Sequence, residues 1–107
     1  MTALFVMTNC PDQTNAETIA RALVEAGLAA CVNILAPCQS IYRWQGSIET
    51  ANEVPLLIKT TSERYSELEA LIRAGHPYQV PEIIALPITA ALPAYLDWLV
   101  SETGVKT

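Results

Sequence analysis

The segment SIYRWQGSIETANEVPLLIKT, residues 40–60, decides the predicted fold of this chain. Its first half is rich in aromatic and β-branched residues and its second half ends in an apolar run, so we expect a hairpin of two long strands. The polar cluster Glu49–Asn52 is the expected turn. Pro55 cannot donate a ladder hydrogen bond, which indicates a sheet edge or a bulge at that residue.

The predicted hairpin is too long for a monomer of this size. Arms of about eight or nine residues, at about 3.3 Å per residue, reach nearly 30 Å. A globule of 107 residues has a radius of gyration of only about 13 Å. The hairpin therefore projects and leaves Ile41, Tyr42, Trp44 and Ile48 in need of cover. Burial against another copy of the chain is the economical solution, and a hairpin that folds back on its own sheet is the alternative.

Before the hairpin, the hydrophobic pattern predicts a strand, a helix and a second strand. The apolar run 4–7 is typical of a central strand. The helix begins after Asp12, or at a capping box that starts at Thr14, and Gly27 ends it in the left-handed conformation. Residues 28–35 then resume as a strand.

After the hairpin, the pattern predicts another helix and strand and a short terminal helix. The helix starts at Ser62 and ends just before Gly75. Residues 76–78 form a loop, residues 80–88 a strand, and Pro93 lies near the start of the terminal helix.

This order predicts an α+β fold, the ferredoxin-like βαββαβ arrangement of an antiparallel sheet with helices on one face, followed by a short C-terminal helix. The chain has 51% hydrophobic and 16% charged residues, which suits a single domain over residues 1–107.

Charge and hydropathy exclude several classes of partner. Six Lys and Arg against eleven Asp and Glu leave a net charge of −5, which disfavours nucleic acids and membrane surfaces. The most apolar stretch, residues 83–96, contains two prolines and is shorter than the roughly 20 residues that span a bilayer. The N-terminal residues have no positive region, so we expect a cytoplasmic protein.

The sequence contains no catalytic motif, and we expect a binding protein rather than an enzyme. The three cysteines, Cys10, Cys31 and Cys38, form no CxxC pair and are expected to be free thiols, most simply buried as small hydrophobes. A site for an ion such as copper can combine a thiolate, a carboxylate and the imidazole of His76. The alternative for His76 is a hydrogen-bonded loop residue.

Other polar and aromatic residues have two interpretations each. Lys59 is either an anion-binding or salt-bridging group, or a solvated strand residue. Glu53 is too far along the same strand to pair with it, at about 20 Å. Glu82 is expected to pair with an Arg or Lys. The aromatic residues are most simply core or interface anchors, namely Trp44, Tyr78, Tyr95 and Trp98.

Four motifs together resemble the CutA family of divalent-cation tolerance proteins. They are LAACVNI at 28–34, SIYRWQG at 40–46, the strand from Glu53 to Thr60, and HPYQVPEIIALPI at 76–88. The likeness extends from the first strand to Trp98. It implies a ferredoxin-like subunit, a homotrimer whose long hairpins pair between subunits, and a build similar to the PII signalling proteins.

The resemblance also implies a copper site. The ligands described for the family are a cysteine at the end of the first strand and two consecutive histidines before Pro-Tyr. Those positions hold Thr8, Gly75 and His76 here, and only His76 is a good copper ligand. Cys10 lies on the same side of an alternating strand as Thr8 and can replace it. Cys31, in the Ala-Ala-Cys motif, matches the family.

Two hypotheses about function follow. In the first, a homotrimer binds a divalent, copper-type metal ion in metal-ion tolerance or response; the ligands are His76 and a thiol from Cys31 or Cys10, with Glu53 as a further oxygen donor. In the second, a PII-like trimer binds a small anionic ligand in a cleft between subunits, and the cleft is formed by Tyr42, Trp44, Glu53, Lys59, His76 and Tyr78. A scaffold whose partner determines its role is a third option.

Overall fold

The computed structural model describes residues 2–104, and the order of its elements is the predicted one. Met1 and residues 105–107, the two ends of the predicted domain, lie outside the described residues. The elements are β1 (Ala3–Cys10), α1 (Gln13–Glu25), β2 (Cys31–Ile34), β3 (Cys38–Trp44), β4 (Ser47–Thr61), α2 (Tyr65–Gly75), β5 (Ile83–Pro87) and α3 (Pro93–Glu102).

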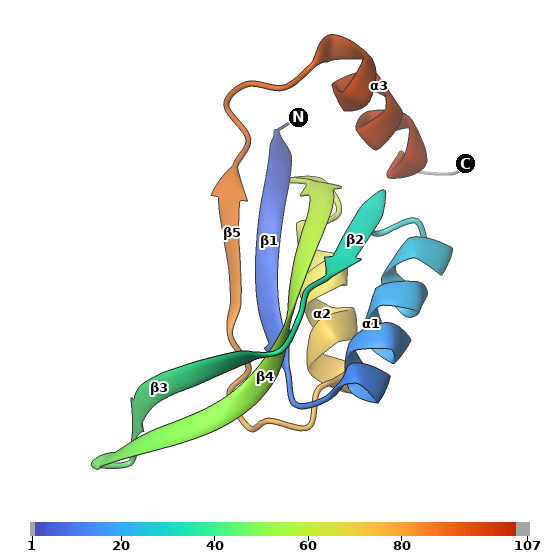
Figure 1. The fold of residues 1–107 in the computed structure, drawn as a ribbon. Helices are drawn as coiled ribbons and strands as arrows, with labels where there is room; N and C mark the ends of the chain where they lie inside the picture. Colours follow the sequence, from blue (N-terminus) through green and yellow to red (C-terminus); the bar gives the residue numbers. More distant parts are fainter. Residues whose placement is uncertain (1, 105–107) are drawn as a thin grey trace.

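The strands form one antiparallel sheet in the order β2-β4-β1-β5, with β3 paired to the distal half of β4. Helices α1 and α2 cover one face of the sheet, as the ferredoxin-like arrangement requires (Figure 1). Alternate residues of β1 and β4 point toward these helices and are fully buried. The core they form includes Val6, Leu56 and Ile58 from the sheet with Ile19, Leu23, Leu68 and Ile72 from the helices.

Helix α1 uses the first of its two predicted caps. The side chain of Asp12 accepts a hydrogen bond from the backbone N–H of Asn15 at 2.7 Å, and the helix begins at Gln13. The capping box predicted at Thr14 is therefore wrong, because Asp12 already caps the helix two residues earlier. Gly27 has a φ of 69° and ends the helix in the left-handed conformation, as predicted.

The turn of the hairpin differs from the prediction. It lies at Gln45 and Gly46, with φ values of 49° and 83°, and not at Glu49–Asn52. Positive φ at both central residues is the requirement of a type I′ turn, whose twist matches that of the flanking strands. The polar residues 49–52 are paired strand residues instead, and Tyr42 lies across from Glu49.

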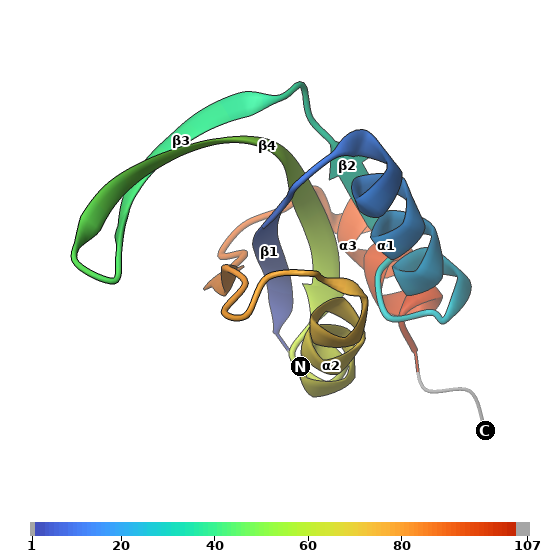
Figure 2. The same cartoon turned by 90° about the horizontal axis from the view of Figure 1, so that it is seen from below.

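The hairpin projects from the body of the subunit. Figures 1 and 2 show β3 and the distal half of β4 extending past the helices and curving away from the rest of the sheet. The chain accordingly measures 45 × 26 × 23 Å, with a radius of gyration of 14.4 Å. The hairpin does not fold back on its own sheet, which leaves Ile41 and Ile48 about two-thirds exposed.

Pro55 lies at an interruption in the pairing of β4, as its missing N–H predicts. β2 pairs with β4 up to Leu56, β3 resumes at Glu53, and the chain between them crosses the gap. The carbonyl of Pro55 accepts a hydrogen bond from the backbone N–H of Leu35. The N–H and C=O of a strand residue point to the same side. The N–H that Pro55 lacks would therefore point to the gap between β2 and β3, where no ladder hydrogen bond is lost.

Three predicted elements are shorter in the structure. The strand expected at 28–35 is limited to Cys31–Ile34, because Leu28 and Ala29 turn back to hydrogen-bond the carbonyl of Leu23. Helix α2 begins at Tyr65 rather than Ser62, after a turn closed by Arg64 and Thr61. The strand expected at 80–88 is limited to Ile83–Pro87, and Pro93 starts α3 as predicted.

Candidate functional site: an acidic aromatic cavity at the base of the hairpin

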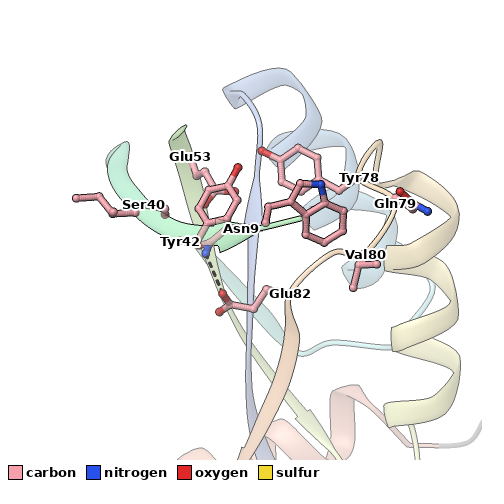
Figure 3. A pocket seen from close by; sticks show the side chains of 10 residues that line it. Asn9, Ser40, Tyr42, Glu53, Tyr78, Gln79, Val80 and Glu82 are labelled. Carbon is pink, nitrogen blue, oxygen red and sulfur yellow. Dashed lines mark hydrogen bonds between the residues drawn. The ribbon is translucent and has the colours of Figure 1, made fainter. Parts of the chain in front are cut away.

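A cavity of about 650 Å³ lies where the hairpin leaves the sheet. Its walls come from the end of β1, from β3 and β4, and from the loop that precedes β5 (Figure 3). The residues that line it are Asn9, Ser40, Ile41, Tyr42, Trp44, Glu53, Tyr78, Gln79, Val80 and Glu82.

Glu53 is the buried charge of this cavity. Its side chain is 7% exposed, and Figure 3 shows it beside the phenol rings of Tyr42 and Tyr78. The only ion pair within residues 2–104 joins Arg64 and Glu67, so Glu53 has no cationic partner there. A buried carboxylate without a compensating positive charge is costly, and it makes this end of the sheet attractive to cations.

Tyr78 keeps its phenol proton beside this carboxylate. Burial and then the negative charge of Glu53 raise the pKa of Tyr78 to about 12, with a further contribution from hydrogen bonding to Glu53. At neutral pH the phenol is therefore a donor that faces the Glu53 carboxylate.

His76 positions Tyr78 rather than lining the cavity. Its Nδ1 accepts the backbone N–H of Tyr78 at 3.2 Å, and its Nε2 lies 2.6 Å from the carbonyl oxygen of Asn9. Because Nδ1 is the acceptor, the proton is on Nε2, which donates to Asn9. The two rings are stacked at a tilt, with centroids 4.6 Å apart. His76 is thus the hydrogen-bonded loop residue of the alternative interpretation, and both of its ring nitrogens are occupied.

Cys10 lies on the core face of the sheet, paired with Val54, whereas the adjacent Glu53 faces the opposite side. It is fully buried, and burial, with the negative charges of Asp12 and Glu53, raises the pKa of its thiol to about 11. The thiol is therefore protonated at neutral pH. Of the three cysteines, all free, only Cys10 is the buried small hydrophobe that we expected; Cys31 is half-buried and Cys38 is exposed.

The structure does not bring the four predicted metal ligands together. Cys10, Glu53 and His76 lie at one end of the sheet, with Cys10 on the core face and Glu53 on the opposite face. Cys31 lies across from Lys59, six residues along β4 from Glu53. That separation is about 20 Å. In the described part of the chain, no group of three or more His, Cys, Asp or Glu side chains is placed to hold a metal ion. Within one subunit, Cys31 therefore lies apart from the other predicted ligands.

Within one chain, the structure brings together four of the six residues predicted for the cleft. Tyr42, Trp44, Glu53 and Tyr78 line the cavity, whereas Lys59 and His76 do not. Lys59 donates to Asn33 Oδ1, and its Nζ lies 5.9 Å from the centroid of the Phe5 ring. No lysine or arginine within residues 2–104 lines the cavity, so its charge is negative and does not suit an anion.

The sequence missed several lining residues, of which Glu82 matters most. Glu82 does not pair with an Arg or Lys as predicted; its carboxylate accepts a hydrogen bond from Asn9 Nδ2 at 3.5 Å (Figure 3). The pairing of Thr8 with Ile83 brings the end of β1 beside the start of β5. The sequence alone does not give this strand register, which places Asn9 beside Glu82, and so it could not predict their contact.

Comparison with known proteins shows the family. Residues 4–102 match the family model described as "CutA1 divalent ion tolerance protein". The chain belongs to the CutA family. The divalent-cation tolerance protein CutA of Thermus thermophilus is 50% identical over 99 residues, which cover 92% of this chain and 96% of that protein. A CutA homolog from Xenopus laevis is 50% identical over 90 residues, but this chain spans only 60% of its length.

Solved CutA structures have the same fold. CutA from Xylella fastidiosa superposes with a TM-score of 0.94 at 42% identity, over 97% of this chain and 100% of that one. CutA from Archaeoglobus fulgidus, described as periplasmic, gives 0.92 at 39% identity, over 95% and 99% of the two chains. An Arabidopsis thaliana relative is described as chloroplastic. No helix within residues 2–104 is long and apolar enough to cross a membrane.

Proposed function

We propose that this CutA chain contributes to tolerance of divalent cations by binding the cation itself, as a homotrimer, with copper as the first ion to test. The role is one of binding and not of catalysis. The observation that carries the proposal is Glu53, a carboxylate that is 7% exposed and has no cationic partner within residues 2–104.

The neighbours of Glu53 suit a borderline ion such as copper. The thiol of Cys10 lies near enough for the Glu53 charge to raise its pKa, and His76 is hydrogen-bonded to the residue that precedes Cys10. Thiolate, imidazole and carboxylate ligands together favour copper over magnesium or calcium. Binding must displace the Cys10 proton and one hydrogen bond of His76, so affinity rises with pH.

A copper titration of single variants tests this site. We expect Glu53→Gln and His76→Ala to weaken binding at least tenfold, measured by competition with a chelator of known affinity. Cys31→Ala is the matched control, because Cys31 lies at the far end of β4. Unchanged affinity in both Glu53→Gln and His76→Ala contradicts the site, and so does a loss confined to Cys31→Ala.

The homotrimer is supported by apolar surface that one chain leaves open. The sheet face opposite α1 and α2 carries Ile84 and Leu86, which are 48% and 54% exposed. They belong to β5, an edge strand of the sheet. An exposed apolar edge strand is an association hazard unless it is covered. The projecting hairpin of a neighbouring copy is of a shape to cover it, and closed symmetry then gives a finite assembly.

A second candidate function, a PII-like trimer that binds a small organic ligand, is favoured by the cavity itself. Its volume of about 650 Å³ is in the range of small-molecule sites, and three aromatic residues line it. The anionic ligand that we first expected does not suit the two carboxylates there. A thermal-shift screen of metabolites tests this candidate, because a ligand at 100 times its Kd stabilises by about 2.7 kcal/mol.

We also propose a cytoplasmic location. The three cysteines of the chain are free, and Cys38 is exposed, which suits a reducing compartment. Fractionation of cells that express the tagged protein tests the location, and recovery in the periplasm contradicts it.

A further inference from the structure

The cavity at the base of the hairpin combines two carboxylates with three aromatic rings. We propose that it binds an elongated aliphatic ammonium ion, and that a diamine with one ammonium group near Glu53 and the other near Glu82 fits best. The proposal rests on the second candidate function, a small-ligand cleft, and does not depend on copper binding.

The first argument is the sign of the charge. Glu53 and Glu82 both line the cavity, and no lysine or arginine within residues 2–104 lines it. The chain as a whole carries a net charge of −5. Glu53 is more than nine-tenths buried, so its uncompensated charge lies in a medium less polar than water, where attraction to a cation is stronger.

The second argument is the aromatic lining. Tyr42 and Trp44 come from β3, and Tyr78 comes from the loop before β5. These rings are partly exposed, between 37% and 44%, so they are accessible from the cavity. The face of an aromatic ring attracts an ammonium group and also covers methylene groups. Such a lining suits an organic cation with an aliphatic chain.

The third argument is the separation of the strands that carry the two carboxylates. Glu53 lies on β4 and Glu82 directly precedes β5, and β1 lies between these two strands. Neighbouring strands are about 4.8 Å apart, so the two backbones are separated by about 10 Å. An alkyl chain with an ammonium group at each end can span this separation and place one cation near each carboxylate.

The carboxylates also favour a ligand that carries N–H groups. An ionised carboxylate is only an acceptor of hydrogen bonds. Asn9 Nδ2 supplies one donor to Glu82, and the phenol ring of Tyr78 lies beside Glu53 (Figure 3). Primary ammonium groups add charge-assisted donors at both ends, whereas a quaternary ammonium ion offers none.

The test is a titration of the full chain, in EDTA, with putrescine, n-butylamine and succinate. Calorimetry gives the affinities, and tryptophan fluorescence reports occupancy because Trp44 lines the cavity. We expect putrescine to bind at least fivefold more tightly than n-butylamine, and succinate not to bind. Trp98→Phe keeps the fluorescence change and Trp44→Phe abolishes it.

Two charge-removing variants test the placement of the ligand. Glu53→Gln weakens putrescine binding at least tenfold, and Glu82→Gln removes the preference for putrescine over n-butylamine. Glu63→Gln is the matched control, because Glu63 is exposed and does not line the cavity. Circular dichroism checks that each variant is folded.

Three results overturn the proposal: no putrescine binding at millimolar concentration, binding of succinate instead, or equal putrescine affinity in the chain and in a folded Glu53→Gln variant. The outcome is independent of copper. A chain that binds copper but no amine refutes this inference alone, and a chain that binds amine but no copper refutes the metal site alone.

Discussion

The Nδ1 atom of His76 accepts a hydrogen bond from the backbone N–H of Tyr78, only two residues further along the chain. The other ring nitrogen holds the carbonyl of Asn9 at the end of β1. One imidazole thus ties the loop before β5 to the sheet and fixes where the Tyr78 ring stands. His76 therefore shapes the cavity without lining it.

Replacing His76 by Ala should destabilise the fold by about 1 to 3 kcal/mol, because the variant leaves the carbonyl of Asn9 and the N–H of Tyr78 without their partner. Urea unfolding at fixed protein concentration measures this. Val80→Ala in the same loop is the control, since the Val80 side chain is two-thirds exposed. Equal stability of the two variants contradicts a stabilising role for the hydrogen bonds of His76.

The buried thiol of Cys10 predicts a loss of stability at alkaline pH. Burial raises the pKa of Cys10 from 9.0 to about 11, so the folded chain retains a proton that the unfolded chain has lost. The free energy of unfolding should therefore fall as the pH rises from about 9 to about 11. Urea midpoints across this range measure the fall.

Cys10→Ala should remove that part of the pH dependence, and Cys38→Ala, at an exposed thiol, should leave it unchanged. The pKa of Tyr78, raised to about 12, also lowers the free energy of unfolding above pH 10. The Tyr78→Phe variant removes this contribution and leaves that of Cys10. A Cys10→Ala profile that parallels the parent contradicts the role of Cys10.

The tip of the hairpin is strained at one residue and can be improved. Gln45 has a φ of 49°, which is unfavourable for a side chain of its kind, and it precedes Gly46 in the type I′ turn. Gln45→Asn should stabilise the chain by a few tenths of a kcal/mol to about 1 kcal/mol. Gly46→Ala should destabilise it by about 1 kcal/mol through backbone strain alone, since nothing lies within 4 Å of the added Cβ. Thermal unfolding tests both signs.

A charge on the open face of β5 should break the proposed trimer. Leu86 is 54% exposed in one chain, so Leu86→Asp costs little in the fold of the subunit but places a charge inside the interface. Sedimentation equilibrium should give the mass of three chains for the parent and of one chain for the variant. Glu63→Gln should stay trimeric. A monomeric parent rejects the assembly.

Removing the charge of Lys59 should not affect ligand binding in the cavity. Lys59 is engaged with Asn33 and lies over Phe5, away from the lining residues. Lys59→Met should therefore change the putrescine and copper affinities less than twofold. A loss of affinity comparable with that of Glu53→Gln means that Lys59 acts on the site.

The element order and the length of the hairpin were predictable because they follow from local signals. Helical spacing, Gly27 and Pro93 marked the ends of helices α1 and α3, and the aromatic run at residues 40–46 marked the hairpin. The turn was misplaced because Gln-Gly is a weak type I′ signal, and the polar residues 49–52 gave a stronger one. In a projecting hairpin, polar strand residues are also solvated, so polarity does not distinguish turn from strand.

Only part of the site was predictable, because the register of the strands decides which residues come together there. The aromatic members were found from composition, but the partners of Glu53 depend on which residues of β1 and β5 face β4. That register is a long-range property, and no local pattern gave it. Lys59 was assigned to the cleft as an anion-binding group, and its engagement with Asn33 depends on the pairing of β2 with β4, which no local pattern gives.

β4 is one continuous strand that contributes residues both to the core and to the cavity. Val54, Leu56 and Ile58 face the helices, and Glu53, Leu57 and Lys59 face the other way. An insertion or deletion of one residue within residues 53–59 moves the residues on one side of it to the opposite face, whereas a change of two residues keeps every residue on its face. Insertions and deletions within residues 53–59 should therefore be tolerated only in even steps unless a bulge compensates, whereas the length of the hairpin beyond Glu53 is free of this constraint.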